Sequence, residues 1–468
     1  MCSCTAAFGP GYTIESQEIH VQFAATPQPQ IHVESFYQVR NTGNQPVSEL
    51  EVRLPARRSF HVEDAAAFWD GAAISASVSP ANPRDAVFAL PAPWKMSDRH
   101  ALRLSAEFRP APAGAGLAFT SDAFFLPSEG WAPELLPTRG LFGTGGVPPK
   151  QWRLFVRVPQ GFLVHASGRS GKTSRNGTDI TVESVQTPAD TYPFVIAGAY
   201  HQMSLGDSKP KVLLWTRAAM DSGALHDSVE AMTRVVRAYD TAFGNRAGDA
   251  QPLWMVECPV VPGCFSTENS SYADYLGARP GATSAELASA DALVVDFAGG
   301  TLKLAGAAPA LAASWLGYGR NPGFYDQEPP LSALPAFASS LGREAILGPA
   351  AREEAIRRAL QQIPRSGPAR RSEDEKVLRA KSFLFFYALQ QRYGPDVFRR
   401  AIGHMLSARR GRGFSLDDLI AAFEQETHQN VAEFVRLWMK HPSVPDDFRA
   451  SYEGTAAALA TTSKENMP

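Results

Sequence analysis

The chain has 468 residues, which is more than one domain normally contains, so we expect two or three domains. Its apolar fraction of 44% and charged fraction of 20% are ordinary for globular proteins. The formal net charge of −2 gives no electrostatic reason to expect nucleic acid or an anionic membrane as a partner, and the sequence has no apolar run of about 18 residues that would predict a transmembrane segment.

The N-terminal segment does not predict a secretory leader. Residues 1–17, MCSCTAAFGPGYTIESQ, have neither a basic start nor an apolar stretch, and a signal peptide needs both. We therefore predict a cytoplasmic protein by default. A mature exported form whose leader has been removed stays open, because such a chain could begin in the same way.

Residues 12 to about 203 predict an all-β domain. Apolar and polar residues alternate there with the period of half-buried strands. The pattern covers Ile19–Phe23, Ile31–Arg40, Val47–Leu54, His100–Phe108, Trp152–Val158, Thr178–Glu183 and Phe194–Met203. Many short strands at this spacing predict a sandwich or saddle of antiparallel sheets.

One motif in this domain imitates a phosphate-binding loop. Residues 168–173 read Gly-Arg-Ser-Gly-Lys-Thr, but a phosphate loop also needs a glycine five residues before Gly171 and a helix directly after Thr173. Ala166 occupies the first of these positions, and the segment SRNGTDITV predicts a turn into a strand. We therefore expect no nucleotide site here.

A mixed α/β region begins where the composition changes, at residues 206–209. Asp221 and Ser222 are N-cap candidates for a helix that runs to about Phe243. Further strands are predicted at Lys211–Thr216, Leu253–Val256 and Ala292–Phe297.

Four cysteines are too few for a disulfide framework. Cys258 and Cys264 flank a Pro-Val-Val-Pro-Gly turn and could pair or stay separate. The sequence favours two buried thiols, because free cysteine is often buried. No histidine occurs between His226 and His404, and a nucleophilic cysteine needs one nearby.

Three later segments contain short motifs that can be compared with those of known proteins. Residues 262–269 read Pro-Gly-Cys-Phe-Ser-Thr-Glu-Asn and end in Glu268 and Asn269. Residues 309–317, PALAASWLG, predict a buried helix of small and apolar residues, in which Pro309 is acceptable only at the start. Residues 332–340 read SALPAFASS.

From Arg352 onward the sequence predicts helices. They are expected at Arg352–Gln362, Glu373–Tyr393, Val397–Leu406, Leu416–Thr427 and Val431–Met439. Ser415 is the expected N-cap of the fourth.

These segments resemble the aminopeptidase N-type zinc peptidases, the gluzincin family. That family carries roughly His-Glu-Leu-Ala-His-Gln-Trp-Trp-Gly on its metal-binding helix, and this chain keeps Leu311, Ala312, Trp315 and Gly317. Residues 332–340 are similar to the family's next helix, Trp-Leu-x-Glu-Gly-Phe-Ala-x-Tyr, since Phe337 matches its Phe.

The resemblance implies that the catalytic groups are replaced. The two zinc-binding histidines and the general-base Glu of the family correspond to Pro309, Ala313 and Ala310. Pro335 stands where the family has the Glu that is its third zinc ligand, and Arg379 stands where it has a Tyr that stabilises the oxyanion.

The resemblance also implies a substrate-binding pair. The family has Gly-Ala-Met-Glu-Asn on a strand beside the zinc, and its Glu receives the free amino group of a peptide. Glu268 and Asn269 match the last two residues of that motif.

The predicted fold class is α+β and multidomain. We expect an N-terminal antiparallel β saddle or sandwich over residues 1–207, a thermolysin-like mixed α/β and helical domain over residues 208–455, and a disordered tail over residues 456–468.

The predicted function is that of an inactive peptidase, with no metal and no cofactor, that binds a protein or peptide in the groove between its domains. The alternative is an aminopeptidase-like hydrolase that uses a non-standard metal site or other groups. For a metal bound elsewhere, His404 and His428 are too far apart in the sequence to judge, and no His-x-x-x-His pair exists. Acid, base or electrostatic groups are available in Glu268, Asp296, Asp326, Glu328 and Arg379.

Overall fold

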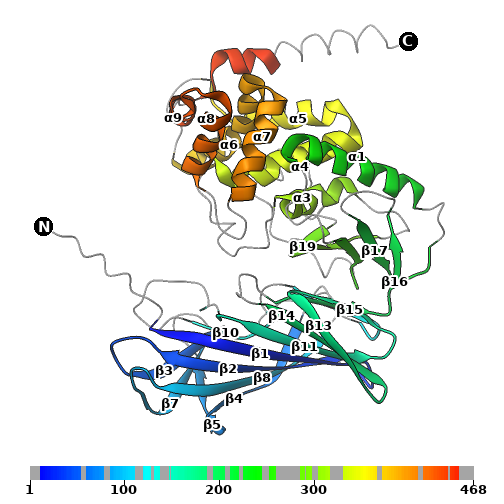
Figure 1. Cartoon of the computed structure of the whole chain (residues 1–468), viewed down its shortest axis with the longest axis vertical. Coiled ribbons are helices and arrows are strands. Elements are labelled where there is room, and N and C mark those ends of the chain that lie inside the picture. Colours follow the sequence, from blue (N-terminus) through cyan, green and yellow to red (C-terminus); the bar gives the residue numbers. More distant parts are fainter. Residues whose placement is uncertain are drawn as a thin grey trace, which may run out of the picture. The chain divides into compact units, whose positions relative to one another are not determined.

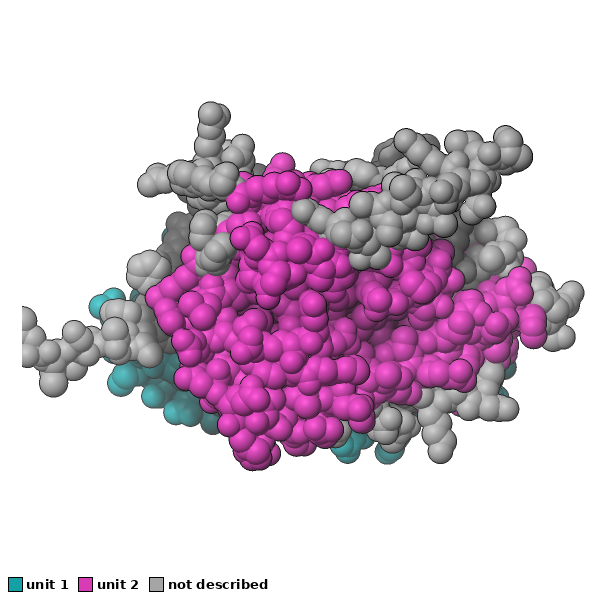
Figure 2. All heavy atoms as spheres, turned by 90° about the horizontal axis from the view of Figure 1, so that it is seen from above, with its two compact units in different colours: residues 1–201, 258–264 teal, residues 202–257, 265–468 magenta. Residues whose placement is uncertain are grey.

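The computed structural model divides into two compact units (Figures 1 and 2). Unit 1 contains Met1–His201 and Cys258–Cys264, and unit 2 contains Gln202–Glu257 and Phe265–Pro468. The residues that the structure describes are 11–53, 60–78, 85–110, 120–127, 131–136, 147, 149–186, 193–205, 211–220, 225–244, 252–259, 285–289, 291–297, 304–316, 330–365, 371–408, 415–440 and 443–452. The predicted domain boundary near residue 207 and the predicted tail lie outside them and stay predictions.

Unit 1 is built around an eight-stranded sheet. Its strands lie in the order β13 (Arg169–Asn176), β14 (Asp179–Gln186), β11 (Trp152–Pro159), β1 (Tyr12–Ala24), β2 (Gln30–Asn41), β8 (Arg99–Pro110), β4 (Phe60–Trp69) and β5 (Ala72–Ile74). The strands predicted at Ile19–Phe23, Ile31–Arg40, His100–Phe108, Trp152–Val158 and Thr178–Glu183 are present in it, whereas the predicted strand Phe194–Met203 is divided into Val195–Gly198 and His201–Ser204, which belong to two other sheets. One detail differs from the predicted antiparallel saddle: β1 and β11 pair in parallel, with Ile19 opposite Leu154, so the sheet is mixed.

Two smaller sheets cover one face of the large sheet. One has the order β10 (Glu134–Leu135), β3 (Val47–Arg53), β7 (Asp85–Trp94) and β6 (Ala76–Val78). The other has the order β12 (Leu163–Ala166), β15 (Val195–Gly198) and β9 (Ala123–Leu126). Strand β1 contributes to both cores. Tyr12 and Ile14 pack with the first small sheet and Ile19 and Val21 with the second, and a bulge between Ile14 and Ser16 shifts the alternation so that all four side chains share one face.

The sequence Gly168–Thr173 does not form a phosphate loop. It belongs to β13 and leads through Gly177, which has a φ of 61°, into the antiparallel strand β14. The expected turn into a strand is confirmed, and the strand–loop–helix context that a phosphate site needs is absent from these described residues.

Unit 2 begins with a five-stranded sheet. Its order is β16 (His201–Ser204), β17 (Val212–Thr216), β18 (Leu253–Glu257), β20 (Ala292–Val295) and β19 (Ala285–Ser289). The pairs β17–β18 and β18–β20 are parallel, and β19 pairs with β20 antiparallel. The strands β17 and β20 are buried along their whole length, as their continuous apolar sequences predict.

Most of the remaining residues that the structure describes in unit 2 are helical (Figure 1). They are α1 (His226–Phe243), α3 (Leu304–Trp315), the short 3-10 helix η3 (Leu331–Ala333), α4 (Leu334–Leu347), α5 (Pro349–Gln361), α6 (Arg371–Tyr393), α7 (Pro395–Ala408), α8 (Leu416–Thr427) and α9 (Val431–Lys440). The helices predicted from Arg352 onward are confirmed. The Ser415 hydroxyl accepts a hydrogen bond from the Asp418 backbone N–H at 3.2 Å, which confirms the predicted cap of α8.

The N-cap prediction for α1 is wrong. The helix begins at His226 with Leu225 as N-cap and no side-chain cap, while Asp221 and Ser222 lie outside the described residues. The hydrophobic stripe of α1, which packs Met232, Val235 and Tyr239 into the core of unit 2, sets its position instead.

In the described part of the chain, every helix is too short or too polar to cross a membrane.

Candidate functional site

Helix α3 carries three of the four positions that the resemblance predicts to be replaced, Pro309, Ala310 and Ala313, called the replaced positions below. It begins at Leu304, so Pro309 lies inside the helix and not in its first turn, and the predicted start at Pro309 is wrong. A proline there removes one helix hydrogen bond. The burial of Ala307, Ala308 and Leu311 in the core of unit 2 outweighs that local cost, which is why tertiary packing and not the proline decides the start of the helix.

The side chains of α3 have little capacity for chemistry. Its sequence, LAGAAPALAASW, contains no ionisable residue. Ala310 and Ala313 are 8% and 9% exposed and belong to the apolar core. The indole N–H of Trp315 donates to the carbonyl of Gly244 at 3.3 Å, which anchors the end of the helix. Pro309, Ala310 and Ala313 therefore hold the helix in place and can neither bind a metal nor move a proton.

Helix α4 carries the fourth replaced position. Pro335 lies in its first turn, where no helix hydrogen bond is lost. Two residues later Phe337 is fully buried, and its ring packs edge-on against Tyr387 with 4.8 Å between centroids. The Ser340 and Tyr387 hydroxyl groups are hydrogen-bonded to each other. The contact between α4 and α6 is thus a closed, mostly apolar one.

Tyr239 of α1 joins α3 and α4. Its hydroxyl donates to the carbonyl of Ala308 at 3.4 Å, and a Cβ at Gly342 would overlap that hydroxyl. Burial raises the pKa of Tyr239 and of Tyr387 well above the usual value, so both hydroxyls stay protonated and act in packing.

Zinc does not fit the residues at the replaced positions. Zinc in peptidases is held by nitrogen, sulfur or carboxylate oxygen, and needs three protein ligands. Pro309, Ala310, Ala313 and Pro335 offer no such atom. Within the described ranges there is also no group of three or more His, Cys, Asp or Glu side chains that could hold a metal ion.

The two histidines proposed for an alternative metal site share one carboxylate. His404 Nδ1 lies 3.1 Å from Glu426, and the charges of His404 and His428 both act on that group. Arg400 is the main influence, since its hydrogen bond at 2.6 Å lowers the pKa of Glu426. A guanidinium in this place favours an exposed ion-pair cluster and not a cation site.

The other predicted site residues are dispersed or lie outside the described residues. Arg379 is on α6 and forms an ion pair with Glu375 at 3.4 Å, and Asp296 is buried just after β20. Glu268, Asn269, Asp326 and Glu328 lie outside the described part of the chain. Their predicted roles, and the correspondence of Arg379 to a catalytic Tyr, stay predictions.

Cys258 forms a disulfide and is not the buried free thiol that the sequence favours. It is 3% exposed and disulfide-bonded, so the favoured buried thiol is wrong here, and its partner lies outside the described residues. Spacing along a sequence does not reveal whether two sulfur atoms meet in space. Because disulfides are rare in cytosolic proteins, this bond weighs against the cytoplasmic location, which stays a prediction.

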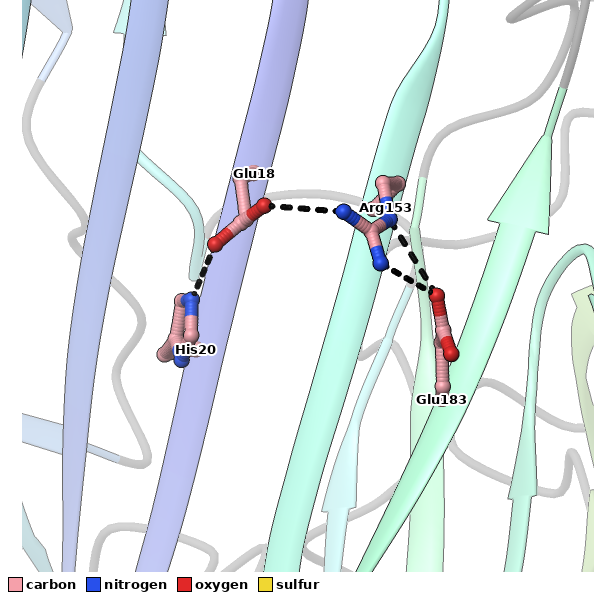
Figure 3. A network of polar contacts seen from close by, with 4 residues as sticks. All are labelled: Glu18, His20, Arg153 and Glu183. Carbon is pink, nitrogen blue, oxygen red and sulfur yellow. Dashed lines mark hydrogen bonds and ion pairs between the residues drawn. The ribbon is translucent and has the colours of Figure 1, made fainter. Parts of the chain in front are cut away.

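A polar network on unit 1 escaped the sequence reasoning. Glu18 and His20 of β1 lie beside Arg153 of β11 and Glu183 of β14 (Figure 3). Arg153 contacts Glu183 at 2.6 Å and Glu18 at 3.4 Å, and His20 contacts Glu18 at 2.7 Å. The alternation in each strand places these residues outward, but the parallel pairing of β1 with β11 that joins them could not be read from the sequence. The network lies on an exposed face of the sheet, and its four residues include no hydroxyl or thiol group.

The fold is that of the M1 zinc metallopeptidases. Similar solved structures include the M1 zinc metallopeptidase from Deinococcus radiodurans, a mutant of it, and that mutant bound to a Tyr-Ser-Ala substrate. Each is 16% identical with a TM-score of 0.52 and covers 93% of this chain, and the matches cover 95%, 96% and 95% of those chains. No protein-family model and no curated protein matches the sequence. A likeness at this identity establishes architecture, a large N-terminal β-sheet domain followed by a helical domain, and leaves the chemistry to the residues themselves.

Proposed function

We propose that this chain is a catalytically inactive relative of the zinc aminopeptidases that works as a protein- or peptide-binding module. The observation that carries the proposal is the chemistry of α3 and of the first turn of α4. Where the resemblance expects two His ligands, a Glu base and a Glu ligand, the chain has Pro309, Ala313, Ala310 and Pro335. Loss of one zinc ligand already cripples such a site, and here all four groups are replaced together.

The packing around α3 supports the same conclusion. Ala310 and Ala313 are buried in an apolar core, beside helices that meet through Tyr239, Trp315 and Phe337. An apolar replacement of buried charged groups is commonly neutral or stabilising. The α3 region therefore has a reason to persist as structure after the loss of its chemistry.

The binding role rests on Glu268. In the family the matching Glu holds an amino group, and a carboxylate holds an ammonium by a charge-assisted hydrogen bond worth about 1.5–3 kcal/mol when shielded from water. Without a zinc dication nearby the surroundings of that carboxylate are less positive, which favours a cation. The proposed ligand is thus a free N-terminus or a basic side chain of a peptide.

The experiment has two arms. The purified chain is dialysed, its zinc content is measured by elemental analysis, and its hydrolysis of an aminoacyl reporter is followed with and without added zinc. We expect far less than one equivalent of zinc and no cleavage above the uncatalysed rate. One retained equivalent of zinc, together with activity that a chelator abolishes, would overturn the proposal of inactivity.

The second arm tests binding. A tripeptide with a free N-terminus is titrated against the chain and against the Glu268→Gln variant, with the N-acetylated tripeptide as control ligand. We expect weaker binding to Glu268→Gln and to the acetylated peptide, by about 10-fold. Equal binding in all three cases would remove Glu268 from the proposed function.

A further inference from the structure

The helical unit contains a cavity that the proposed function does not use. Its volume is about 640 Å³, which lies within the range of about 300–1,000 Å³ typical of small-molecule sites. It opens between α5 and the last described helical segment, residues 446–452. Its described lining residues are Arg352, Glu353, Arg357, Leu360, Gln361, Ile363, Arg365, Arg449, Ser451 and Tyr452. None of the four replaced peptidase positions is among them.

The lining is rich in positive charge. It includes four guanidinium groups and, among the described residues, only the carboxylate of Glu353. The spacing of Glu353, Arg357 and Leu360 places one side of α5 along the cavity. Two of these guanidinium groups have carboxylate partners. Glu354 pairs with Arg357 and also with Arg358, and Glu344 pairs with Arg352 at 3.2 Å, so the positive charge of the lining is partly compensated.

Arg449 is held in place by its neighbours. It is 8% exposed, and its Nη2 donates to the carbonyl of Ile363 at 3.1 Å and to the Ser443 hydroxyl at 3.3 Å. These bonds fix the last helical segment against the end of α5. A guanidinium that is already ordered loses little conformational entropy when it meets an anion.

Neighbouring groups respond to this positive field. Burial lowers the pKa of Arg343, and the charge of Arg358 lowers it further. Burial raises the pKa of Tyr452, while the charge of Arg352 opposes that shift. The Tyr452 hydroxyl is protonated at neutral pH and adds a hydrogen-bond donor to the wall.

We propose that this cavity binds an organic anion that carries a carboxylate or phosphate group on an apolar stem. Guanidinium groups bind both kinds of anion with paired hydrogen bonds. Leu360, Ile363 and the ring of Tyr452 offer an apolar surface for the stem. The volume exceeds what inorganic phosphate alone would fill. This site is independent of the proposed peptide binding at Glu268.

The test uses two probes that share the anionic chemistry. Phenyl phosphate and N-acetyl-Phe-Glu are titrated by calorimetry into the full chain and into the double variant Arg357→Gln/Arg365→Gln. Both residues are partly or fully exposed, so the variant keeps its fold, which thermal unfolding checks. Arg399→Gln is the matched control, because Arg399 is 40% exposed and pairs with a carboxylate at i−3, as Arg357 does at 43%.

We expect at least one probe to bind with a Kd below about 1 mM, and the double variant to weaken it about 10-fold or more. Arg399→Gln should leave the Kd unchanged. Binding of phenyl phosphate alone indicates a phosphorylated ligand, and binding of the peptide alone indicates a carboxylate. The proposal is overturned if neither probe saturates the protein below about 10 mM, or if the double variant binds as the parent does.

Discussion

Two regions of the molecule differ in their polar groups. The contact between α3 and α4 is mostly apolar, whereas one face of the eight-stranded sheet carries a network of charged side chains. Helix α3 has no ionisable side chain, and its residues are closely packed. The sheet face presents Glu18, His20, Arg153 and Glu183 in mutual contact (Figure 3). The predicted correspondence of α3 to a metal-binding helix nevertheless rests on its sequence and not on its charge. A dense set of charges on a surface is therefore no guide to chemistry by itself.

The difference between the buried helices and the exposed sheet face predicts which substitutions have large effects on stability. Buried positions transmit any change in volume or charge to the whole core, whereas exposed ion pairs compete with water and salt. We expect large effects at α3 and α4 and small ones on the sheet face.

Ala313→His should have the largest effect. The position is 9% exposed and apolar, so an imidazole must displace neighbours and lose its hydration. We expect the free energy of unfolding to fall by about 2–5 kcal/mol. Chemical denaturation measures it, and Ala350→His on the exposed side of α5 is the control. Added zinc should not restore the lost stability, because a single histidine does not make a zinc site. A rise in the Tm of Ala313→His on addition of zinc would contradict the conclusion that α3 serves packing alone.

Gly342→Ala should have a smaller but clear effect. A Cβ at this position overlaps the Tyr239 hydroxyl, so α1 and α4 must separate slightly. We expect a loss of about 1–3 kcal/mol. In a Tyr239→Phe background the same substitution should cost less, because the hydroxyl is gone. A double-mutant cycle measures this coupling, and strictly additive effects would show that the two helices do not meet as described.

The buried tyrosines predict a loss of stability at alkaline pH. Burial raises the folded-state pKa of Tyr387 above the unfolded value of about 10. The unfolded chain therefore releases this proton first, so the stabilisation is complete below pH 10 and is lost as pH rises toward the folded pKa. Each such tyrosine contributes a slope of up to about 1.4 kcal/mol per pH unit.

Tyr387→Phe should remove one tyrosine's share of that slope. Denaturant unfolding between about pH 10.5 and 11.5 measures it. Buried Lys381, whose pKa is lowered by burial, adds a slope of opposite sign that is common to parent and variant and cancels in the comparison. Ser340→Ala breaks the same hydrogen bond and keeps the tyrosine, so it should lower the stability without changing the slope. If the free energy of unfolding depended equally steeply on pH in Tyr387→Phe and in the parent, the raised folded-state pKa of Tyr387 would be contradicted.

Much of the fold was predictable because the periodicity of its elements is strong. The alternation in β1 and β2 and the helical stripe of α1 each give one apolar face, and those faces form the cores. The start of α8 follows from Ser415, because a capping box, here formed with Asp418, is a local signal. The start of α3 was missed because packing overrides the cost of Pro309.

The sequence predicts that Pro309, Ala310, Ala313 and Pro335 stand at catalytic positions of the family, and this correspondence stays a prediction. The structure adds the burial of Ala310 and Ala313 and the place of Pro335 in the first turn of α4. The arginine-lined cavity was not predictable, because Arg357 and Arg449 meet through the packing of helices about 90 residues apart in the sequence. The same holds for the parallel pairing of β1 with β11 that builds the surface network.

The smallest expected effect belongs to that network. Arg153 is 50% exposed, and its hydrogen bond to Glu183 raises its pKa while the same bond lowers the pKa of Glu183. Both groups are already charged at neutral pH, so these shifts have no consequence there. Arg153→Gln keeps a hydrogen-bond donor but removes the charge and the guanidinium, whose central carbon lies 4.9 Å from the centre of the Phe155 ring.

We expect Arg153→Gln to shift Tm by less than about 2 °C, since exposed ion pairs contribute little. The difference between variant and parent should shrink further in about 0.5 M NaCl, because salt screens exposed charges within a few ångströms. Phe155→Ala is the contrasting control, since it removes the ring on which His20 stacks at 4.8 Å and should cost more at any salt concentration. A large, salt-independent loss for Arg153→Gln would mean that a partner or ligand group orders this face. The face of the sheet that carries Arg153, and not α3, would then be the functional surface.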